Sequence, residues 1–138
     1  MEVARAMKNL GITIATSIAP NSRLTIQKNA IGSWVEAGFR VASLNEPNEI
    51  KELSNIFKNI EFIPQMRAAK ALFGKPYIYI SDILSYLRTQ DSRISGIINS
   101  DIFLKNTEDF SSFLIQEVEN SLIYGPRLEV KTFKSKDG

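Results

Sequence analysis

The sequence predicts an α/β fold in a single domain, with an open and mainly parallel sheet flanked by helices. Segments that alternate like strands are separated by segments with apolar residues at helical spacing, in the order β-α-β-α-β-α-β-α. This order is typical of a parallel sheet, because parallel neighbours must be joined by a crossover, usually a helix. The chain has 138 residues, of which 43% are apolar and 23% charged, as in ordinary globular domains.

Four segments have the composition of strands. The first, residues 10–18 (LGITIATSI), alternates and is rich in β-branched side chains. The next three are shorter: residues 39–45 (FRVASLN), 60–63 (IEFI) and 94–99 (ISGIIN). Two further short candidates near the end of the chain are residues 121–125 and 127–133.

Helices are predicted between these strands. Residues 24–37 carry an apolar stripe that includes Trp34, after an N-cap at Asn21 or Ser22 and before Gly38. This stripe places Trp34 in the core, and the alternative is a platform for a sugar ring. The second helix starts at Pro47, a residue favoured in the first helical turn, and its apolar face is Ile50, Leu53, Ile56 and Phe57.

The second half of the chain contains two more predicted helices. The third covers about residues 80–89, with Asp82 as a capping residue near its start. The fourth follows a cap at Asn106 or Thr107, and its apolar face is Phe110, Phe113, Leu114 and Val118. For residues 67–76, one helical turn and a structured loop both remain open.

The absence of two residue types limits the chemistry. Without cysteine, the chain has no disulfide, thiolate nucleophile or zinc–sulfur site. Without histidine, it lacks the usual general base and the imidazole metal ligand. A metal bound by these side chains must therefore have oxygen ligands, which favours Mg²⁺, Mn²⁺ or Ca²⁺.

Composition also limits the partners and the location. The net charge is +2 and the basic residues are scattered, so we expect no nucleic-acid partner. No apolar run approaches the roughly 20 residues of a membrane span, and the first residues do not form a secretory signal. We expect a cytoplasmic protein, for which the lack of cysteine is suitable.

Polar residues interrupt an apolar run after the fourth predicted strand, at Asn99, Ser100 and Asp101. In open α/β sheets, ligands bind beyond the carboxyl ends of the strands where the strand order reverses. If the chain winds one way and then returns, the fourth strand lies beside the first. The polar residues would then flank a crevice together with Thr16 and Ser17. The alternative is that the strand simply ends and Asp101 caps a turn.

The sequence contains neither of the common glycine-rich phosphate-binding motifs. A chain without them can bind a nucleoside diphosphate through a divalent cation, which a carboxylate must hold. One aspartate is enough, because such cations keep several waters and take other ligands from the phosphates. Asp101 is the candidate for this role.

Five segments together resemble the GT-A superfamily of nucleotide-diphospho-sugar transferases, a group of glycosyltransferases with a Rossmann-like donor-binding half. They are ATSIAPNSR, IQKNAIGSWVEAGFRVASLN, NEI, FGKPYIYISDIL and GIINSDIFL. The resemblance covers about residues 11–104 and extends to about residue 130. NSDI looks like a variant of the family's Asp-x-Asp (DxD-like) motif, with Asn99 in place of the first aspartate.

The resemblance implies roles for individual residues. Asp101 matches the acidic residue that binds Mn²⁺ or Mg²⁺, and Asn99 the residue that faces the ribose, with Ser100 between them. Thr16 and Ser17 would line the base and ribose. Asn45 and Glu46, which end the second predicted strand, would lie next to the base or ribose.

Alternatives stay open for these residues and for two arginines. Thr16 and Ser17 can be ordinary strand and turn residues, and Asn45 with Glu46 can cap the helix that begins at Pro47. Arg23 and Arg67 are candidates for phosphate binding, because a guanidinium is a planar donor suited to that group. Each can instead be a solvated surface residue.

The resemblance implies one nucleotide-sugar-binding domain over residues 1–138. A truncated piece of a larger transferase and a stand-alone nucleotide-binding relative both stay open, and residues 131–138 are expected to be a disordered tail. A complete enzyme of this fold needs a second half for the acceptor, so catalysis stays open. The alternative is an inactive nucleotide-binding or structural module of the same fold. An exposed sheet edge in such a half-domain favours a homo-oligomer.

Overall fold

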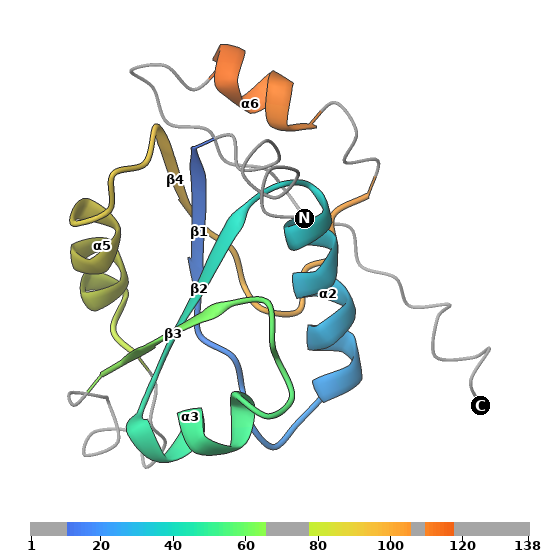
Figure 1. Cartoon of the computed structure of the whole chain (residues 1–138), viewed down its shortest axis with the longest axis vertical. Helices are drawn as coiled ribbons and strands as arrows, with labels where there is room; N and C mark the ends of the chain where they lie inside the picture. Colours follow the sequence, from blue (N-terminus) through green and yellow to red (C-terminus); the bar gives the residue numbers. More distant parts are fainter. Residues whose placement is uncertain (1–10, 66–77, 106–109, 118–138) are drawn as a thin grey trace.

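The central sheet is parallel throughout, as predicted, and its strands lie in the order β3-β2-β1-β4 (Figure 1). The computed structural model describes residues 11–65, 78–105 and 110–117. The strands are β1 (Ile12–Thr16), β2 (Arg40–Asn45), β3 (Glu61–Pro64) and β4 (Ile94–Ile97). β4 pairs with β1, so the predicted neighbourhood of the first and fourth strands is confirmed.

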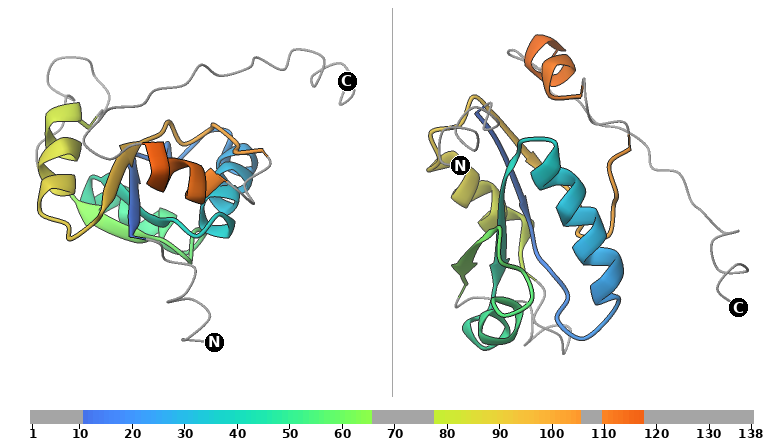
Figure 2. Two further views of the ribbon diagram at one scale, coloured as in Figure 1. Left: turned by 90° about the horizontal axis from the view of Figure 1, so that it is seen from above. Right: turned by 45° about the vertical axis from the view of Figure 1, so that its right-hand side comes forward.

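Helices lie on both sides of the sheet. Those in the described part are α2 (Leu24–Glu36), α3 (Pro47–Leu53), α5 (Ile80–Arg88) and α6 (Phe110–Glu117). The views in Figure 2 place α2 and α5 on opposite faces of the sheet. The chain therefore places β2 and then β3 on one side of β1. It returns through α5 and adds β4 on the other side of β1.

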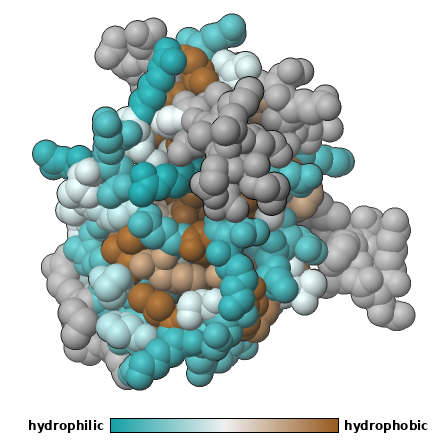
Figure 3. Space-filling model, viewed as in Figure 1, coloured by the Kyte–Doolittle hydropathy of each residue, from teal (hydrophilic) through white to brown (hydrophobic). Residues whose placement is uncertain are grey.

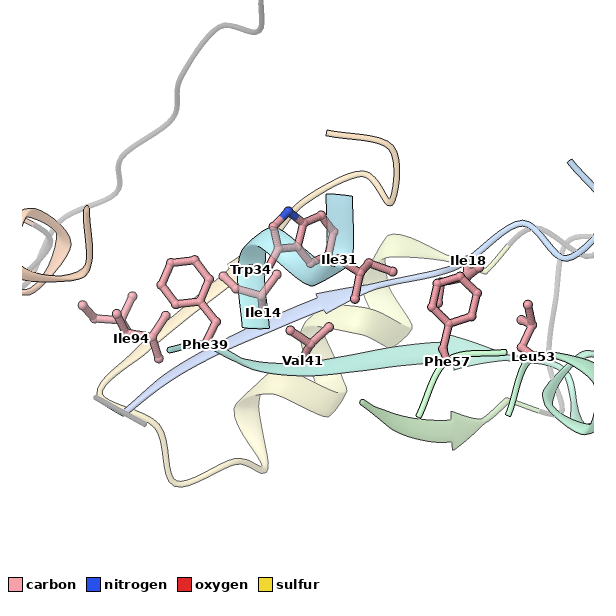
Figure 4. Packing of buried hydrophobic residues seen from close by; sticks show 10 residues of the cluster. Ile14, Ile18, Ile31, Trp34, Phe39, Val41, Leu53, Phe57 and Ile94 are labelled. Carbon is pink, nitrogen blue, oxygen red and sulfur yellow. The ribbon is translucent and has the colours of Figure 1, made fainter. Parts of the chain in front are cut away.

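The main hydrophobic core lies between α2 and the sheet. Trp34 is completely buried there, so its assignment to the core is confirmed. Figure 4 shows its ring beside Ile14 of β1 and Ile31 of α2, with Phe57 and Leu53 at the other end of the same core. The buried members of this core are Ile12, Ile14, Ile18, Ile31, Trp34, Phe39, Val41, Leu53, Phe57 and Ile94.

A smaller core covers the opposite face of the sheet. Ala15 and Leu44 contribute from β1 and β2, and Ile83 and Leu87 contribute from α5. Tyr86 of α5 packs against this cluster and donates a hydrogen bond to Glu61 of β3 over 3.3 Å. Burial raises the pKa of the Tyr86 phenol, and the negative charge of Glu61 raises this pKa further.

Several predicted element ends differ from the structure. α3 ends at Leu53, and the turn that follows supplies the buried Phe57 and the partly buried Ile56. β4 ends at Ile97, two residues before Asn99, although the Ile98 N–H still donates to the Ala15 carbonyl over 3.3 Å. Apolar spacing reports which side chains are buried, and it continues past the last backbone hydrogen bond of an element.

The sheet is only partly covered at β3. Phe62 and Ile63 of this strand are half-buried, and the strand pairs only with β2 within the described residues. Apolar side chains reach the surface around β3 (Figure 3).

In the described part of the chain, no helix combines the length and apolar character that a membrane crossing requires.

Some predictions fall outside the described residues. They concern the choice between turn and loop at residues 67–76, the cap at Asn106 or Thr107, the strand candidates at residues 121–125 and 127–133, and the disordered tail at residues 131–138.

Candidate functional site

The strand order reverses between β1 and β4, and a cleft of about 830 Å³ lies at the carboxyl ends of these two strands. This is the position at which open α/β sheets bind ligands. Its polar lining comes mainly from the loops after β1 and β4, and isoleucines such as Ile18, Ile83 and Ile97 supply most of its apolar lining. The polar residues are Thr16, Ser17, Asn21, Ser22, Arg23, Gln27, Glu49, Asn99, Ser100 and Asp101.

Gln27, near the start of α2, holds the loop that follows β1. Its side chain is 2% exposed. Its amide nitrogen donates to the carbonyls of Ala19 (2.9 Å) and Ser22 (2.8 Å), and its oxygen accepts from the Ala19 N–H (2.9 Å). The same oxygen accepts from the Ser100 hydroxyl over 2.6 Å, so Gln27 connects the loops after β1 and β4.

The N-cap of α2 is Arg23, and the predicted cap at Asn21 or Ser22 is wrong. Arg23 has φ 52° and ψ 38°, the left-handed conformation, and its side chain makes no capping hydrogen bond. Gln27 instead holds the preceding loop from within the helix, because its amide nitrogen donates to the Ser22 carbonyl. A non-glycine residue in this conformation costs about 1 kcal/mol or more, and such residues cluster at functional sites.

The loop after β4 is fixed against α2 by side chains of the helix. Asn99 to Ile102 form a turn in which the Ile102 N–H donates to the Asn99 carbonyl over 3.1 Å. The Trp34 indole N–H donates to the Ile102 carbonyl (2.8 Å), and the Leu104 N–H donates to the Ser33 hydroxyl oxygen (3.0 Å). In Figure 4 the indole nitrogen of Trp34 points toward this loop. Asp101 is thus presented from a turn with several anchors.

Arg23 and Asp101 form an ion pair across the cleft. The Arg23 Nη1 and Asp101 Oδ2 atoms are 3.2 Å apart, and the side chains are 60% and 30% exposed, respectively. They come from different loops, separated by 78 positions in the sequence. The two loops therefore place one cationic and one anionic side chain together at the same end of the sheet.

A buried polar layer supports the cleft from below. Asn45, at the end of β2, is fully buried and donates both amide hydrogens, one to the Ile18 carbonyl and one to the Glu49 carboxylate, each over 2.9 Å. The Ser43 hydroxyl donates to Asn45 Oδ1 (2.6 Å) and accepts from the Ile18 N–H (3.0 Å). These contacts fix both backbone polar groups of Ile18, which follows Thr16 and Ser17.

Replacement of Asn45 by alanine is expected to destabilise the protein. The Ile18 carbonyl and the Glu49 carboxylate would lose their buried donor, which costs about 1–3 kcal/mol of unfolding free energy. Urea denaturation followed by circular dichroism measures this difference. The matched control is Asn55→Ala, because Asn55 donates to the Lys51 carbonyl at an exposed position, where about 0.5 kcal/mol or less is expected. Equal costs at both positions would contradict the supporting role of Asn45.

The structure brings six of the predicted site residues to the cleft: Thr16, Ser17, Arg23, Asn99, Ser100 and Asp101. Asn45 lies beneath the cleft instead of lining it. Glu46 is the N-cap of α3 and forms a capping box with Glu49, in agreement with the alternative of a helix cap. Arg67 lies outside the described residues.

Two residues of the cleft, Gln27 and Glu49, were not predicted from the sequence. Gln27 had a detectable signal, since it is a polar residue on the stripe that also carries Ala30, Ile31 and Trp34 and is therefore directed toward the core. Glu49 had a weaker one, the acidic residue three positions after the N-cap Glu46. Its position in the cleft follows from tertiary packing and has no local signal.

The oxygen ligands of the cleft suit a divalent cation that is already bound to the phosphates of a ligand. Within the described ranges, no three carboxylate side chains gather as a metal-binding group. Asp101 offers one accessible carboxylate, while the carboxylate of Glu49 already accepts from Asn45 and from the Glu46 N–H. Mg²⁺ commonly binds through one or two carboxylates plus substrate phosphates. The residues fit such a metal–phosphate complex and do not form a closed cation site.

Comparison of the chain with protein-family models, with curated proteins and with solved structures finds no match. The geometry of the cleft and the residues around it are therefore the basis for a functional proposal.

Proposed function

We propose that this chain binds a nucleoside-diphosphate sugar, through a divalent cation, in the cleft between the ends of β1 and β4. The observation that supports this most strongly is the convergence of two distant loops: Arg23 and Asp101 meet there, 3.2 Å apart. One side chain suits an anionic phosphate and the other a cation, and a metal-bound diphosphate carries both charges.

Each residue of the cleft is assigned a different part of the ligand. Asp101 holds the cation, Mn²⁺ or Mg²⁺, and Arg23 binds a phosphate oxygen. Thr16 and Ser17, at the end of β1, lie beside the nucleoside, and Asn99 contributes a neutral hydrogen-bonding group. When bound, the cation neutralises the charge of the diphosphate, which would be the leaving group in glycosyl transfer.

A glycosyltransferase would transfer the sugar of the bound donor to an acceptor. A second candidate function is a module that binds the nucleotide without transfer. The two carboxylates that line the cleft favour the second candidate within the described part of the chain. Asp101 is paired with Arg23, and Glu49 is held by Asn45 and by the backbone of α3. Neither is placed as a free general base. Transfer to an acceptor would therefore use groups beyond these two.

A calorimetric titration tests the proposed binding. Diphosphates of uridine, guanosine, cytidine and adenosine are titrated into the protein with Mn²⁺ and, separately, with a chelator. At least one diphosphate is expected to bind about tenfold or more tightly with the metal, since a charge-assisted contact contributes about 1.5–3 kcal/mol. The matching nucleoside monophosphate should gain less, because it offers fewer phosphate oxygens to the cation.

The location of binding is tested by amide chemical shifts with Mg²⁺ as the diamagnetic cation. The largest shifts are expected for residues 16–27 and 97–101, and small shifts at the opposite end of the sheet, around Gly11 and Arg93. The proposal would be overturned if no diphosphate bound with either cation, or if the shifts mapped away from the cleft.

A further inference from the structure

Arg23 and Asp101 block each other as binding groups. The guanidinium occupies the carboxylate that would bind a cation, and the carboxylate occupies the guanidinium that would bind a phosphate. In the structure the guanidinium of Arg23 lies 3.2 Å from the carboxylate of Asp101. A cation can approach Asp101 fully only when the positive charge of Arg23 moves away. A phosphate can pair fully with Arg23 only when this arginine leaves Asp101, whose negative charge would then face the phosphate.

The ion pair is not needed to hold either loop. The loop that carries Arg23 is held by Gln27, through hydrogen bonds to Ala19 and Ser22. The turn that carries Asp101 is anchored by Trp34 and by the Ser100 hydroxyl. The Arg23 side chain is 60% exposed, so it can rotate away without disturbing buried contacts.

The backbone of Arg23 is a second, independent observation. Its φ of 52° is the only positive φ among the non-glycine residues that the structure describes. A left-handed residue at the N-cap sets the direction in which the side chain leaves the loop, and here that direction leads to the rim of the cleft. The loop is thus held in a conformation of higher energy that keeps the arginine next to Asp101.

We propose that Arg23 and Asp101 act as an exchangeable pair that makes the site selective for a cation and a diphosphate bound together. This inference rests on the proposed function. A cation alone leaves Arg23 unpaired and repelled, and a diphosphate alone leaves Asp101 unpaired and repelled. When both bind, Asp101 exchanges arginine for the cation and Arg23 exchanges carboxylate for phosphate. The two ligands therefore favour each other's binding, and this coupling is reciprocal.

The Arg23→Gln variant tests the exchange, because the two ligands should respond in opposite directions. Mn²⁺ alone, followed by the relaxation of water protons, is expected to bind about three- to tenfold more tightly, since the competing cation is gone while an exposed ion pair is weak. The diphosphate alone, followed by calorimetry with a chelator, is expected to bind about tenfold more weakly, because its charge-assisted contact is lost.

Two further variants serve as controls. Arg23→Lys keeps the positive charge, so its affinity for Mn²⁺ alone should stay within about twofold of the wild type. Arg88→Gln removes an exposed positive charge at the last turn of α5 and should change neither affinity. Circular dichroism melts establish that each variant is folded.

The exchange would be overturned if Arg23→Gln left the affinity for Mn²⁺ unchanged or weakened it, while the wild-type protein bound the metal–diphosphate complex. A purely structural arginine predicts weaker binding of both ligands. Absence of any diphosphate binding by the wild type with Mn²⁺ present would instead overturn the proposed function, and the exchange with it. The wild-type titration therefore separates the two failures.

Discussion

Asp101→Asn is expected to remove the dependence of nucleotide binding on the divalent cation. Asparagine keeps the size and an oxygen but has no charge, and hard cations bind carboxylates far better than neutral amides. Loss of this contact should weaken metal-dependent binding of a nucleoside diphosphate by about 10- to 100-fold, equivalent to about 1.5–3 kcal/mol. Calorimetry with and without Mn²⁺ measures the effect.

The matched control for this variant is Asp91→Asn. Asp91 is exposed and precedes β4, whereas Asp101 follows it, so the two substitutions are identical in chemistry but lie at opposite ends of the strand. Asp91→Asn should leave nucleotide binding unchanged. Asn99→Ala should weaken binding less than Asp101→Asn, because a neutral hydrogen bond contributes about 0.5–1.5 kcal/mol. Equal metal-dependent affinities in wild type and Asp101→Asn would contradict the metal role.

The architecture could be predicted because two separate periodicities mark it. Strand alternation and helical spacing occur in turn along the chain, and the structure has the corresponding strands and helices in that order. The pairing of β4 with β1 followed from the winding of open α/β sheets and from no local signal. With that pairing, the polar ends of the two strands had to lie at one edge of the sheet.

The supporting contacts of the site could not be predicted in the same way. Asn45 ends a predicted strand and lies two residues before Pro47, a pattern equally compatible with a ligand contact and with a cap. Its actual role depends on the position of Ile18, which comes from a different strand and loop. A polar side chain at the end of a strand will either face solvent or satisfy buried backbone groups, and only the tertiary structure decides between them.

The start of α2 shows the same limit. Asn21 and Ser22 are favourable N-cap residues, but the helix begins after Arg23. Gln27 binds the loop backbone from one turn into the helix and also reaches Ser100, from the far end of the chain. The capping preference of Asn21 and Ser22 therefore does not fix the start of this helix, and the contact of Gln27 with Ser100 had no local signal.

Trp34 connects the stability of the core with the geometry of the site. Its side chain is completely buried between α2 and the sheet, and its indole N–H donates to Ile102 in the turn that carries Asp101. The aromatic ring contributes burial, and the N–H satisfies a backbone carbonyl that would otherwise lose its partner. Substitutions that separate these two contributions should therefore have different effects on stability and on binding.

Trp34→Ala is expected to lower the unfolding free energy by about 3–5 kcal/mol, a large part of the stability of a domain of this size. Trp34→Phe keeps an aromatic ring but removes the N–H, so a smaller loss of about 1–3 kcal/mol is expected. Urea denaturation followed by far-ultraviolet circular dichroism measures both losses, since Trp34 is the single tryptophan and its fluorescence is lost in either variant.

The matched core variant is Leu53→Ala at the end of α3, expected to cost about 2–5 kcal/mol. Only the Trp34 variants should also accelerate amide hydrogen exchange at Ile102 and weaken metal-dependent nucleotide binding. If Leu53→Ala weakened binding as strongly as Trp34→Phe, the effect would come from general destabilisation, and the anchoring of the Asp101 turn by the indole would be wrong.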